Sequence, residues 1–411
     1  MVDVGIVMPV YTQDSAIFRK AIQSVLRQRY RQFQLVIVID GVTPNVSRIA
    51  RYFARKDSRV RVLPQLKNRG TAHALNIGFQ FLTRQPRIKY LTWVSSDNIY
   101  YPRFVGALRN RLVNSTPDIG LAYSAFRLIN RKGKVIHMPW MNNLHEFQNQ
   151  PKEHLVDYYF IHYAFMYKKE YAQKIDGYQN TPVEDYDYFL RLTDHCNITY
   201  VPMTLMGFRL RSPHSNSLQI AQSNKKRRNR RYLMYSVMQQ ARLRRNILPD
   251  LTFILLVTDA SQDTVQSLEK LLSQSYSNYK LLIYDLSATQ SFLPVLYENP
   301  DTRVIYQSIP YGTIHNVAAQ GLALTDTPLV IFYQPDPGLL HKDSVLDPNY
   351  LAESVSRYGV RAFRQDLGYT QIDETPPPPD QPVNWAEGPK LGQIYRTDAI
   401  KLSLNGIPAQ M

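Results

Sequence analysis

The sequence lacks the features that mark membrane-spanning or disulfide-bonded proteins. It has a single cysteine, Cys196, which excludes an internal disulfide bond and favours an intracellular setting. No apolar run approaches the roughly 20 residues that a transmembrane helix requires. The opening MVDVGIVMPV leads directly into a strand pattern, without the basic start and cleavage site of a signal peptide. We therefore expect a cytoplasmic protein without a transmembrane segment.

Acidic residues are few relative to basic ones. The 411-residue chain contains 49 Lys and Arg against 33 Asp and Glu, a formal net charge of +16. Much of the excess lies in residues 224–246, NKKRRNRRYLMYSVMQQARLRRN. This pattern is typical of a solvated helix between domains, and it would also attract a phosphate-bearing donor, an anionic polymer or a membrane surface. The sequence leaves these alternatives open, but it contains no nucleic-acid recognition motif, so we expect no nucleic-acid partner.

The first hundred residues alternate between strand and helix patterns. Strands are predicted at residues 4–10, 34–40, 59–65 and 90–97, and helices at 16–28, 46–56 and 71–82. Such alternation with short connections predicts an α/β domain, in which helices cover a mostly parallel sheet. Ligands of these sheets bind at the carboxyl ends of the strands. In this chain those ends carry Tyr11, Asp40 and Asp97.

The same pattern starts again near residue 251. LTFILLVTDASQD matches VGIVMPVYTQD, and RVIYQSIPYGTIHNVAAQGLAL matches RVRVLPQLKNRGTAHALNIGFQFL. Further along, IYRTDAIKLSLNG matches MYKKEYAQKIDG, so the matching blocks keep one order. An ordered series of this kind indicates an internal duplication. We therefore predict two tandem domains, residues 1–220 and 251–411, joined by a basic helical linker at residues 221–250.

Several motifs of the first copy together resemble a known enzyme family. VMPVY, LRQRY, LVIVIDG, NRGTAHALNIG, EDYDYFLRL and FRLRSPHSNS follow one another within residues 4–218. In this order they resemble the inverting nucleotide-sugar glycosyltransferases of family two, and SSDNIYYP is similar to the metal-binding segment of their spore-coat members. The resemblance implies the GT-A fold, a Rossmann-like mixed and mostly parallel sheet flanked by helices. It also implies a nucleoside-diphosphate sugar donor with UDP favoured, a hydroxyl acceptor such as a glycan, and an association with the spore coat.

The chemistry implied by the resemblance requires the departing diphosphate to be neutralised. A divalent cation, Mn²⁺ or Mg²⁺, does this when one or two carboxylates hold it. The resemblance assigns Asp97 to the metal and puts His214 near the metal or diphosphate. Asp97 would equally suit a turn or helix N-cap, and His214 a surface turn. Ser95 and Ser96 stand where the family often has further acids, so we expect weaker metal binding.

Nucleotide contacts are also implied by the resemblance. Asp40 matches an aspartate that accepts a hydrogen bond from the base, and a uracil imide N–H suits such an acceptor. Tyr11 matches a residue that packs near the base, and Arg69 could pair with diphosphate oxygens. Tyr11 and Arg69 would also fit as ordinary loop residues. The predicted nucleotide-binding set is completed by Pro9, Asn76, Ser96 and Asp97.

An inverting transfer needs a base to remove the proton of the acceptor hydroxyl. In TPVEDYDYFLRL the resemblance assigns this role to Asp185, with Glu184 beside it. The residues that follow predict a helix, so Asp185 lies near its N-terminus and would alternatively cap it. Asp187 is expected to be a solvated acid of the first turn.

The second copy has lost several of these residues. Its first strand continues as LLVTDAS without the tyrosine, and the acid of its second strand is displaced by one position to Asp285. Asp336 aligns with Asp97 but has prolines on both sides, and the chain ends at GIPAQM before a counterpart of Asp185. We therefore predict a metal-dependent transferase domain followed by a non-catalytic one. The alternative is a protein of the same fold that binds a glycan or nucleotide without catalysis. The sequence leaves a homo-oligomer and a peripheral contact with an anionic surface open.

Overall fold

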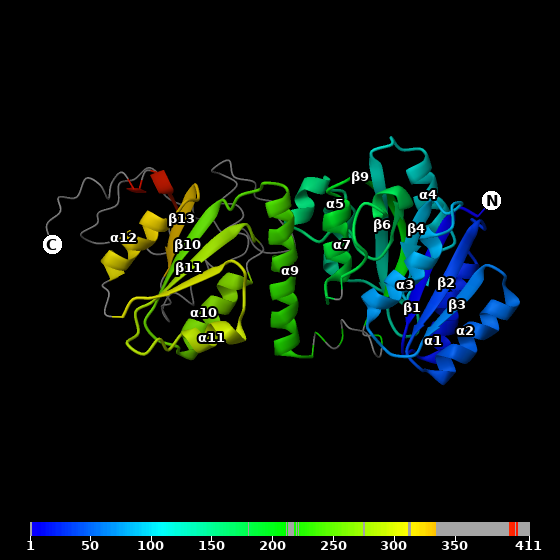
Figure 1. Ribbon diagram of the computed structural model, residues 1–411, viewed down its shortest axis with the longest axis horizontal. Helices are drawn as coiled ribbons and strands as arrows, with labels where there is room; N and C mark the ends of the chain where they lie inside the picture. Colours follow the sequence, from blue (N-terminus) through cyan, green and yellow to red (C-terminus); the bar gives the residue numbers. More distant parts are fainter. Residues whose placement is uncertain are drawn as a thin grey trace. The chain divides into compact units, whose positions relative to one another are not determined.

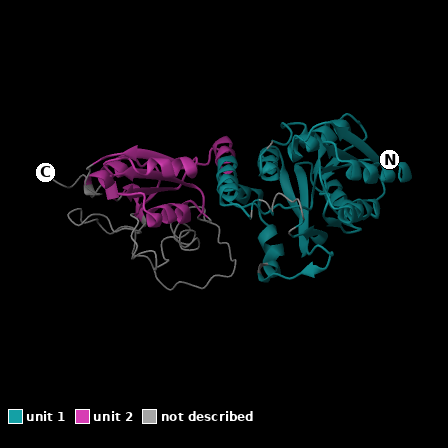
Figure 2. Ribbon diagram, turned by 90° about the horizontal axis from the view of Figure 1, so that it is seen from below, with its two compact units in different colours: residues 1–237 teal, residues 238–411 magenta. Residues whose placement is uncertain are grey.

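The chain is divided into two compact units. The structure, a computed structural model, describes residues 2–179, 181–210, 212, 218, 220, 222–273, 276–310, 314–333, 394–398, 400 and 401. The units are Met1–Val237 and Met238–Met411, coloured teal and magenta in Figure 2. The boundary falls inside a single long helix, α9 (Asn224–Arg244). The basic segment is therefore helical, as the sequence predicts, and its two halves belong to different units.

The first unit contains a mixed sheet that has nine strands among the described residues (Figure 1). Its strand order is β3-β2-β1-β4-β8-β6-β9-β5, with β7 paired to β6. The pairs β1–β2, β2–β3, β1–β4 and β6–β9 are parallel, whereas β8 is antiparallel to both of its neighbours. The strands are β1 (Val4–Val10), β2 (Phe33–Asp40), β3 (Val60–Gln65), β4 (Tyr90–Trp93), β5 (Ile99–Tyr100), β6 (Ile119–Ile129), β7 (Val135–Ile136), β8 (Phe165–Lys168) and β9 (Asn197–Arg209).

Helices flank this sheet, and local sequence signals define where some of them begin. The side chain of Asp14 accepts hydrogen bonds from the N–H groups of Ala16 and Ile17 and so caps α1. Pro44, at the first position of α2, suits a helix start because its missing N–H would have no partner there. The helices are α1 (Ser15–Leu26), α2 (Pro44–Lys56), α3 (Thr71–Thr83), α4 (Phe104–Val113), α5 (Leu144–Gln148), α6 (Lys169–Ala172) and α7 (Glu184–Leu192), with 3₁₀ turns η1 (Pro139–Asn143) and η2 (Lys152–Val156).

The second unit repeats the first part of this topology. Its described strands follow the order β12-β11-β10-β13-β14, which corresponds position by position to β3-β2-β1-β4-β8. As in the corresponding series β3-β2-β1-β4-β8, only the last of these pairs, β13–β14, is antiparallel. The elements are β10 (Leu251–Val257), α10 (Gln262–Leu272), β11 (Tyr279–Asp285), α11 (Leu293–Glu298), β12 (Val304–Ser308), α12 (Ile314–Leu324), β13 (Leu329–Tyr333) and β14 (Ile394–Arg396).

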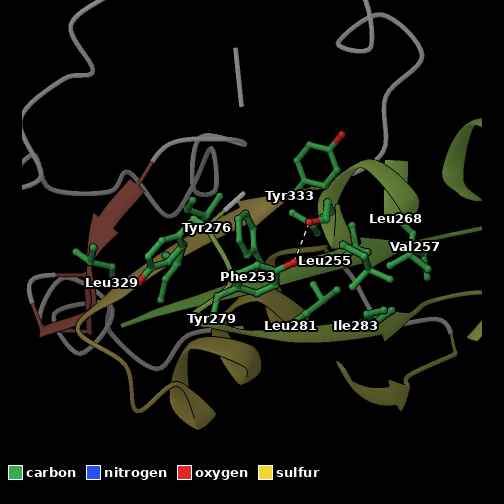
Figure 3. Packing of buried hydrophobic residues seen from close by; sticks show 14 of the residues in the cluster. Phe253, Leu255, Val257, Leu268, Tyr276, Tyr279, Leu281, Ile283, Leu329 and Tyr333 are labelled. Carbon is green, nitrogen blue, oxygen red and sulfur yellow. Dashed lines mark hydrogen bonds between the residues drawn. The ribbon is translucent and has the colours of Figure 1, made fainter. Parts of the chain in front are cut away.

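Apolar residues of the second unit pack on both faces of its sheet. On one face Phe253, Leu255 and Leu281 pack against Leu268 of α10 (Figure 3). On the other face the strand residues contact α12 through Val317 and neighbouring side chains. A sheet covered on both faces explains why β10 reads as an uninterrupted apolar run, LTFILLV, that is buried throughout. None of the helices in the described part of the chain combines the length and apolar character needed to cross a membrane.

Candidate active site

The carboxyl ends of β1, β2 and β4 meet at one edge of the first sheet, where the predicted residues lie. Pairing of β4 with β1 ends at Val7–Trp93, whereas β1 continues beside β2 as far as Val10–Ile39. Beyond Trp93 the chain leaves the sheet and carries residues 95–97 across this edge. Pro9, half-buried, lies after the last β4 pair, so the N–H that it lacks interrupts no pairing with β4.

Asp40 fixes the turn that precedes α3. Its side chain is only 4% exposed. One oxygen accepts a hydrogen bond from the N–H of Gly70 at 2.8 Å, and the other accepts one from the N–H of Arg69 at 3.1 Å. A carboxylate at this position satisfies N–H groups at the helix start and interacts favourably with the helix dipole. Asp40 therefore has a structural role in addition to the predicted contact with a base.

Next to Asp40, an exposed aromatic ring lies against a glycine that has a left-handed backbone. Gly41 has φ +109°, and a Cβ at this position would lie 3.1 Å from the Asn68 nitrogen and 3.2 Å from Cε2 of Tyr11. Tyr11 is 48% exposed, and the side chain of Arg69 is exposed as well. An open ring, a buried carboxylate and an exposed guanidinium thus share this edge. These groups could stack on a base, accept its N–H and pair with phosphate oxygens.

Asp97 lies at the same edge, with one of its carboxylate oxygens occupied. Ser95 Oγ donates a hydrogen bond to Asp97 Oδ1 at 2.5 Å. Within the described part of the chain, no hydrogen bond reaches the second oxygen, Oδ2. Ser96 Oγ accepts a bond of 3.4 Å from Nε2 of Gln13. Ser95, one of the two serines that replace the expected acids, therefore orients Asp97 and leaves one carboxylate oxygen available.

A buried arginine adjoins Asp97 that the sequence analysis did not single out. Arg209, 2% exposed, ends β9 and donates from Nε to the Asp97 carbonyl at 2.7 Å. Its Nη1 donates to the carbonyls of Asn130 and Arg131 at 2.7 and 2.6 Å. Burial lowers the pKa of Arg209, and the charges of Asp97 and Asp14 oppose that shift. The guanidinium brings positive charge to the edge that would receive a diphosphate.

Asp185 lies in the first turn of α7 and is hydrogen-bonded to the end of β4. Trp93 Nε1 donates to Asp185 Oδ1 at 3.0 Å, although 92 residues separate the two in sequence. Burial raises the pKa of Asp185 well above its usual range, and the neighbouring Glu184 raises it further, while the bond from Trp93 acts in the opposite direction. Burial also raises the pKa of Glu184. A carboxylate with a raised pKa is a stronger proton acceptor than an ordinary aspartate.

Aromatic residues after η2 form part of the surroundings of Asp185. Tyr159 packs 4.8 Å from Tyr186, centroid to centroid, and 4.9 Å from His162. Burial raises the pKa of Tyr159, and the charge of Asp185 adds to that effect. Burial and the positive charge of Arg230 lower the pKa of His162 to about 4, so this imidazole is neutral at pH 7. These residues lack a recognisable motif, and the sequence analysis missed their connection to Asp185.

Asn76, predicted to bind nucleotide, instead contacts the loop that leads to Asp185. Its Nδ2 donates to the carbonyl of Tyr178, and its Oδ1 accepts from the Tyr178 N–H, each at 2.8 Å. Asn76 lies six residues after Gly70, roughly 9 Å along the helix at 1.5 Å per residue. The structure thus brings together Pro9, Tyr11, Asp40, Arg69, Ser96 and Asp97 at the sheet edge, with Asn76 further along α3.

A resident metal would depend on Asp97 in the described part of the chain. No group of three or more His, Cys, Asp or Glu side chains there is arranged to hold a metal ion. His214 and Asp336 lie outside the described residues. The free oxygen of Asp97 is a donor that Mn²⁺ and Mg²⁺ accept, provided that other oxygens complete the shell. The residues present therefore fit a cation shared with a diphosphate.

In the second unit, the acid at the end of the second strand has a different environment. Val10 pairs with Ile39 in the first sheet and Val257 pairs with Asp285 in the second, so Asp285 occupies the Ile39 position. Asp285 is fully buried. Its carboxylate accepts hydrogen bonds from Ser287 N, Ser287 Oγ, Phe292 N and Tyr306 Oη. The displacement predicted from the sequence thus turns the acid toward the start of α11.

Comparison with known proteins shows which family model and which proteins the chain is similar to. Residues 5–176 match the model of Glycosyl transferase family 2. Glycosyltransferase GlyG of Streptococcus pneumoniae serotype 4 is 28% identical over 116 residues, which are 28% of this chain and 37% of that protein. YibD of Escherichia coli, described as an uncharacterized glycosyltransferase, is 29% identical over 115 residues, 28% of this chain and 32% of YibD. The chain spans about a third of the length of these relatives.

Solved structures show more distant similarity. The mannosyltransferase PcManGT from Pyrobaculum calidifontis, in complex with GDP-Man and Mn²⁺, superposes with a TM-score of 0.45 at 12% identity, over 58% of this chain and 64% of that one. Staphylococcus aureus TarS 1-349 gives a TM-score of 0.42 at 12% identity, over 57% and 65% of the two chains. The stretch that matches the family model lies within the first unit. Residues 5–176 match a Glycosyl transferase family 2 domain, and parts of the chain are similar to curated glycosyltransferases.

Proposed function

We propose that the protein is a metal-dependent inverting glycosyltransferase that moves a sugar from a nucleoside-diphosphate sugar to a hydroxyl acceptor. The observation that carries this proposal is the bond between Trp93 and Asp185. It joins a carboxylate of raised pKa to the end of β4, and the continuation of β4 bears Asp97. This link supports the proposal, because an in-line displacement requires the base and the diphosphate to be held in a fixed geometry.

Recognition of the donor is assigned to the edge formed by β1 and β2. Tyr11 would stack on the base, Asp40 would accept its N–H, and Arg69 would pair with the diphosphate. UDP is the favoured nucleotide because a uracil imide matches the acceptor oxygens of Asp40. The buried charge of Arg209 supports binding of an anionic group beside Asp97.

Asp97 is proposed to hold a divalent cation, Mn²⁺ or Mg²⁺, through Oδ2. When bound, such an ion would neutralise charge on the departing diphosphate. Oδ1 accepts the Ser95 hydrogen bond and is therefore less available. His214 remains a proposed contact of the metal or diphosphate.

Asp185 is proposed to take the acceptor proton. Oδ1 accepts the bond from Trp93, so Oδ2 is the atom that would receive the proton while the acceptor oxygen attacks the sugar carbon. Burial excludes water around this carboxylate, and the proximity of Glu184 favours proton uptake. Glu184 is proposed to assist this proton transfer, because its charge adds to burial in raising the pKa of Asp185. The second unit is proposed to be non-catalytic, since Asp285 is used within its own fold.

One observation favours the alternative of a non-catalytic binding protein. Ser95 and Ser96 replace acids near Asp97, so a single carboxylate would have to hold the cation. A thermal-shift screen of UDP and GDP, each with and without Mn²⁺, separates the two functions when it is combined with a turnover assay on UDP-sugars.

For the active enzyme we expect UDP to raise the melting temperature more in the presence of Mn²⁺. Asp97→Asn, which keeps the shape of the side chain but removes its charge, should abolish the Mn²⁺-dependent part of this shift. Glu298→Gln, an exposed acid of the second unit, serves as the control and should change neither value. Failure of every nucleoside diphosphate to stabilise the protein would refute the proposed donor site. Stabilisation without turnover of any UDP-sugar would favour the binding protein.

A further inference from the structure

The loop before α7 is held from two sides. Arg191, in the last turn of α7, donates from Nη1 to the carbonyl of Asp176 at 2.6 Å and from Nη2 to that of Gly177 at 2.9 Å. Asp187 holds the same guanidinium through an ion pair of 2.6 Å. From the opposite side, the two hydrogen bonds of Asn76 hold the backbone of Tyr178. Residues 176–178 are thus tied to both α7 and α3.

The approach of Asn76 to this loop requires a glycine. A Cβ on Gly177 would lie 2.3 Å from Oδ1 of Asn76, a distance that real Cβ contacts do not show. The ring of Tyr178 is buried between the two helices, stacked 4.0 Å from Tyr188 of α7 and 5.7 Å from Phe79 of α3. Tyr188 follows Asp185 by three residues, so the contact fixes the turn of α7 that carries the carboxylate.

Comparison with α12 of the second unit shows that a helix at the position of α3 can pack on its sheet without an asparagine corresponding to Asn76. Gly78 of α3 and Gly321 of α12 approach corresponding strand positions, Val7 and Val38 for the first, Ile254 and Tyr284 for the second. The residue two positions before the glycine is Asn76 in α3 and Ala319 in α12. An alanine therefore suffices for a helix on this sheet. The amide of Asn76 is used for the loop instead.

We propose that Asn76 is a positioning residue that holds Asp185 in place through the backbone of Tyr178. The proposal rests on the proposed role of Asp185 as the base. The start of α3 is tied to Asp40 and its middle is tied to the loop of Asp185. One rigid helix thus sets the separation between the nucleotide site and the base. A displacement of about 1 Å at such a distance can reduce a rate roughly 100-fold.

The test compares Asn76→Ala and Gly177→Ala in the full-length protein. We expect each to lower kcat about 10–100-fold with the Kd for UDP within about twofold of the parent value. In the variant that carries both substitutions the two effects should not add, because the Cβ added at position 177 meets no amide once Asn76 is replaced by alanine. Gln80→Ala, an exposed substitution on the same helix, should leave kcat and Kd unchanged.

A second readout does not depend on turnover. With Trp140 and Trp385 replaced by Phe, fluorescence of Trp93 reports protonation of the Glu184–Asp185 pair through its bond to Asp185. Asn76→Ala should move the midpoint of this pH titration to lower pH, because a loosened loop admits water to the carboxylates.

The two readouts separate failure of this inference from failure of the proposed function. Loss of UDP affinity in proportion to kcat would make Asn76 a nucleotide contact. An unchanged fluorescence midpoint together with an unchanged kcat would limit Asn76 to fold stability. Either result overturns the positioning role. If the parent protein turns over no donor, the proposed function fails, and the fluorescence titration still decides whether Asn76 positions Asp185.

Discussion

At the scale of single residues, the environment of Asp185, the proposed base, lowers the stability of the folded protein. Burial and the charge of Glu184 raise its pKa above the value of about 4 expected in the unfolded chain. Between these two values the folded protein keeps a proton that the unfolded chain has lost. Stability therefore falls as the pH rises through this window. The carboxylate that is proposed to remove a proton from the acceptor is therefore also one that the folded protein stabilises in its neutral, protonated form.

Replacing Asp185 by Asn should separate these effects. We expect turnover to fall by about 10²–10⁴-fold, the usual contribution of a general base. At pH 7 the melting temperature should rise by a few degrees, because an amide removes the loss of stability that arises when only the unfolded chain ionises freely at this position. The gain should disappear below about pH 4, where the carboxyl is protonated in both states. Melting curves at pH 7 and pH 3.5, together with donor turnover, provide the measurement.

Asp187 of the same helical turn is the control for this change. The prediction of a solvated acid is wrong here, because Asp187 is buried and forms an ion pair of 2.6 Å with Arg191. Asp187→Asn should therefore lower the melting temperature at pH 7, opposite to Asp185→Asn. A lower melting temperature in both variants would contradict the account of Asp185 as a destabilising charge.

The residues of the site differ in how far the sequence predicts them. Asp40, Asp97 and Asp185 are acids at the end of a strand or the start of a helix, so local pattern and family resemblance identify them. Trp93 and Arg209 have no such local signal. Their contacts join positions 92 and 112 residues apart, and such contacts exist only once the sheet has formed. For Asn76 the sequence identifies the motif but not the partner of its amide.

At the scale of elements, Gly41 lies between the end of β2 and the proposed site for the nucleotide base. Its φ of +109° is unfavourable for a side chain, and the space around it is taken by Tyr11 and Asn68. A side chain here would strain the backbone and also displace the aromatic ring. The turn after β2 is thus built to bring Tyr11 close to Asp40.

We expect Gly41→Ala to lower the free energy of unfolding by about 1–2 kcal/mol and to weaken UDP binding. Gly133→Ala is the matched control, because Gly133 has φ +88° but no atom within 4 Å of the place where a Cβ would lie. It should show a similar loss of stability with unchanged UDP affinity. Urea denaturation and calorimetric titration with UDP measure the two quantities. Equal UDP affinity in both variants would argue against a site for the nucleotide base beside Tyr11.

The elements of the first hundred residues follow the predicted alternation because short-range periodicity defines them. The strands β1, β2 and β3 and the helix α3 end within a few residues of the predicted ranges. β4 is shorter than predicted and ends at Trp93, because after the bond from Val94 N–H to the Val7 carbonyl the chain leaves the sheet toward the candidate site. The order of β6, β8 and β9 was not predicted, since their pairing brings together segments distant in sequence.

At the scale of the whole molecule, the same side-chain contact is found inside each of the two units, which also have the same strand order. Arg59 pairs with Asp57 at 2.7 Å, and in the second unit Arg303 pairs with Asp301 at 2.7 Å. Each guanidinium also lies over the first ring of the neighbouring strand, at 4.5 Å from the Phe33 centroid and 4.3 Å from that of Tyr279. Repetition of a contact that involves charge, hydrogen bonds and a ring supports a duplication of the scaffold.

The units differ in the use of the acid that ends the second strand, and this difference gives a test of the proposed division of function. Asp285 accepts hydrogen bonds from Phe292 N and Tyr306 Oη inside its unit, and burial together with its charge raises the pKa of Tyr306 to about 12. Asp285→Asn should lower the free energy of unfolding of the second unit by about 1–3 kcal/mol, because buried donors lose an acceptor. UDP affinity should not change.

Asp40→Asn, the matched substitution in the first unit, should weaken UDP binding about tenfold or more, because a hydrogen bond to a charged acceptor contributes about 1.5–3 kcal/mol. Calorimetric titration and denaturation of both variants provide the comparison. Reduced UDP affinity in Asp285→Asn, with none in Asp40→Asn, would assign the nucleotide to the second unit and reverse the proposed roles.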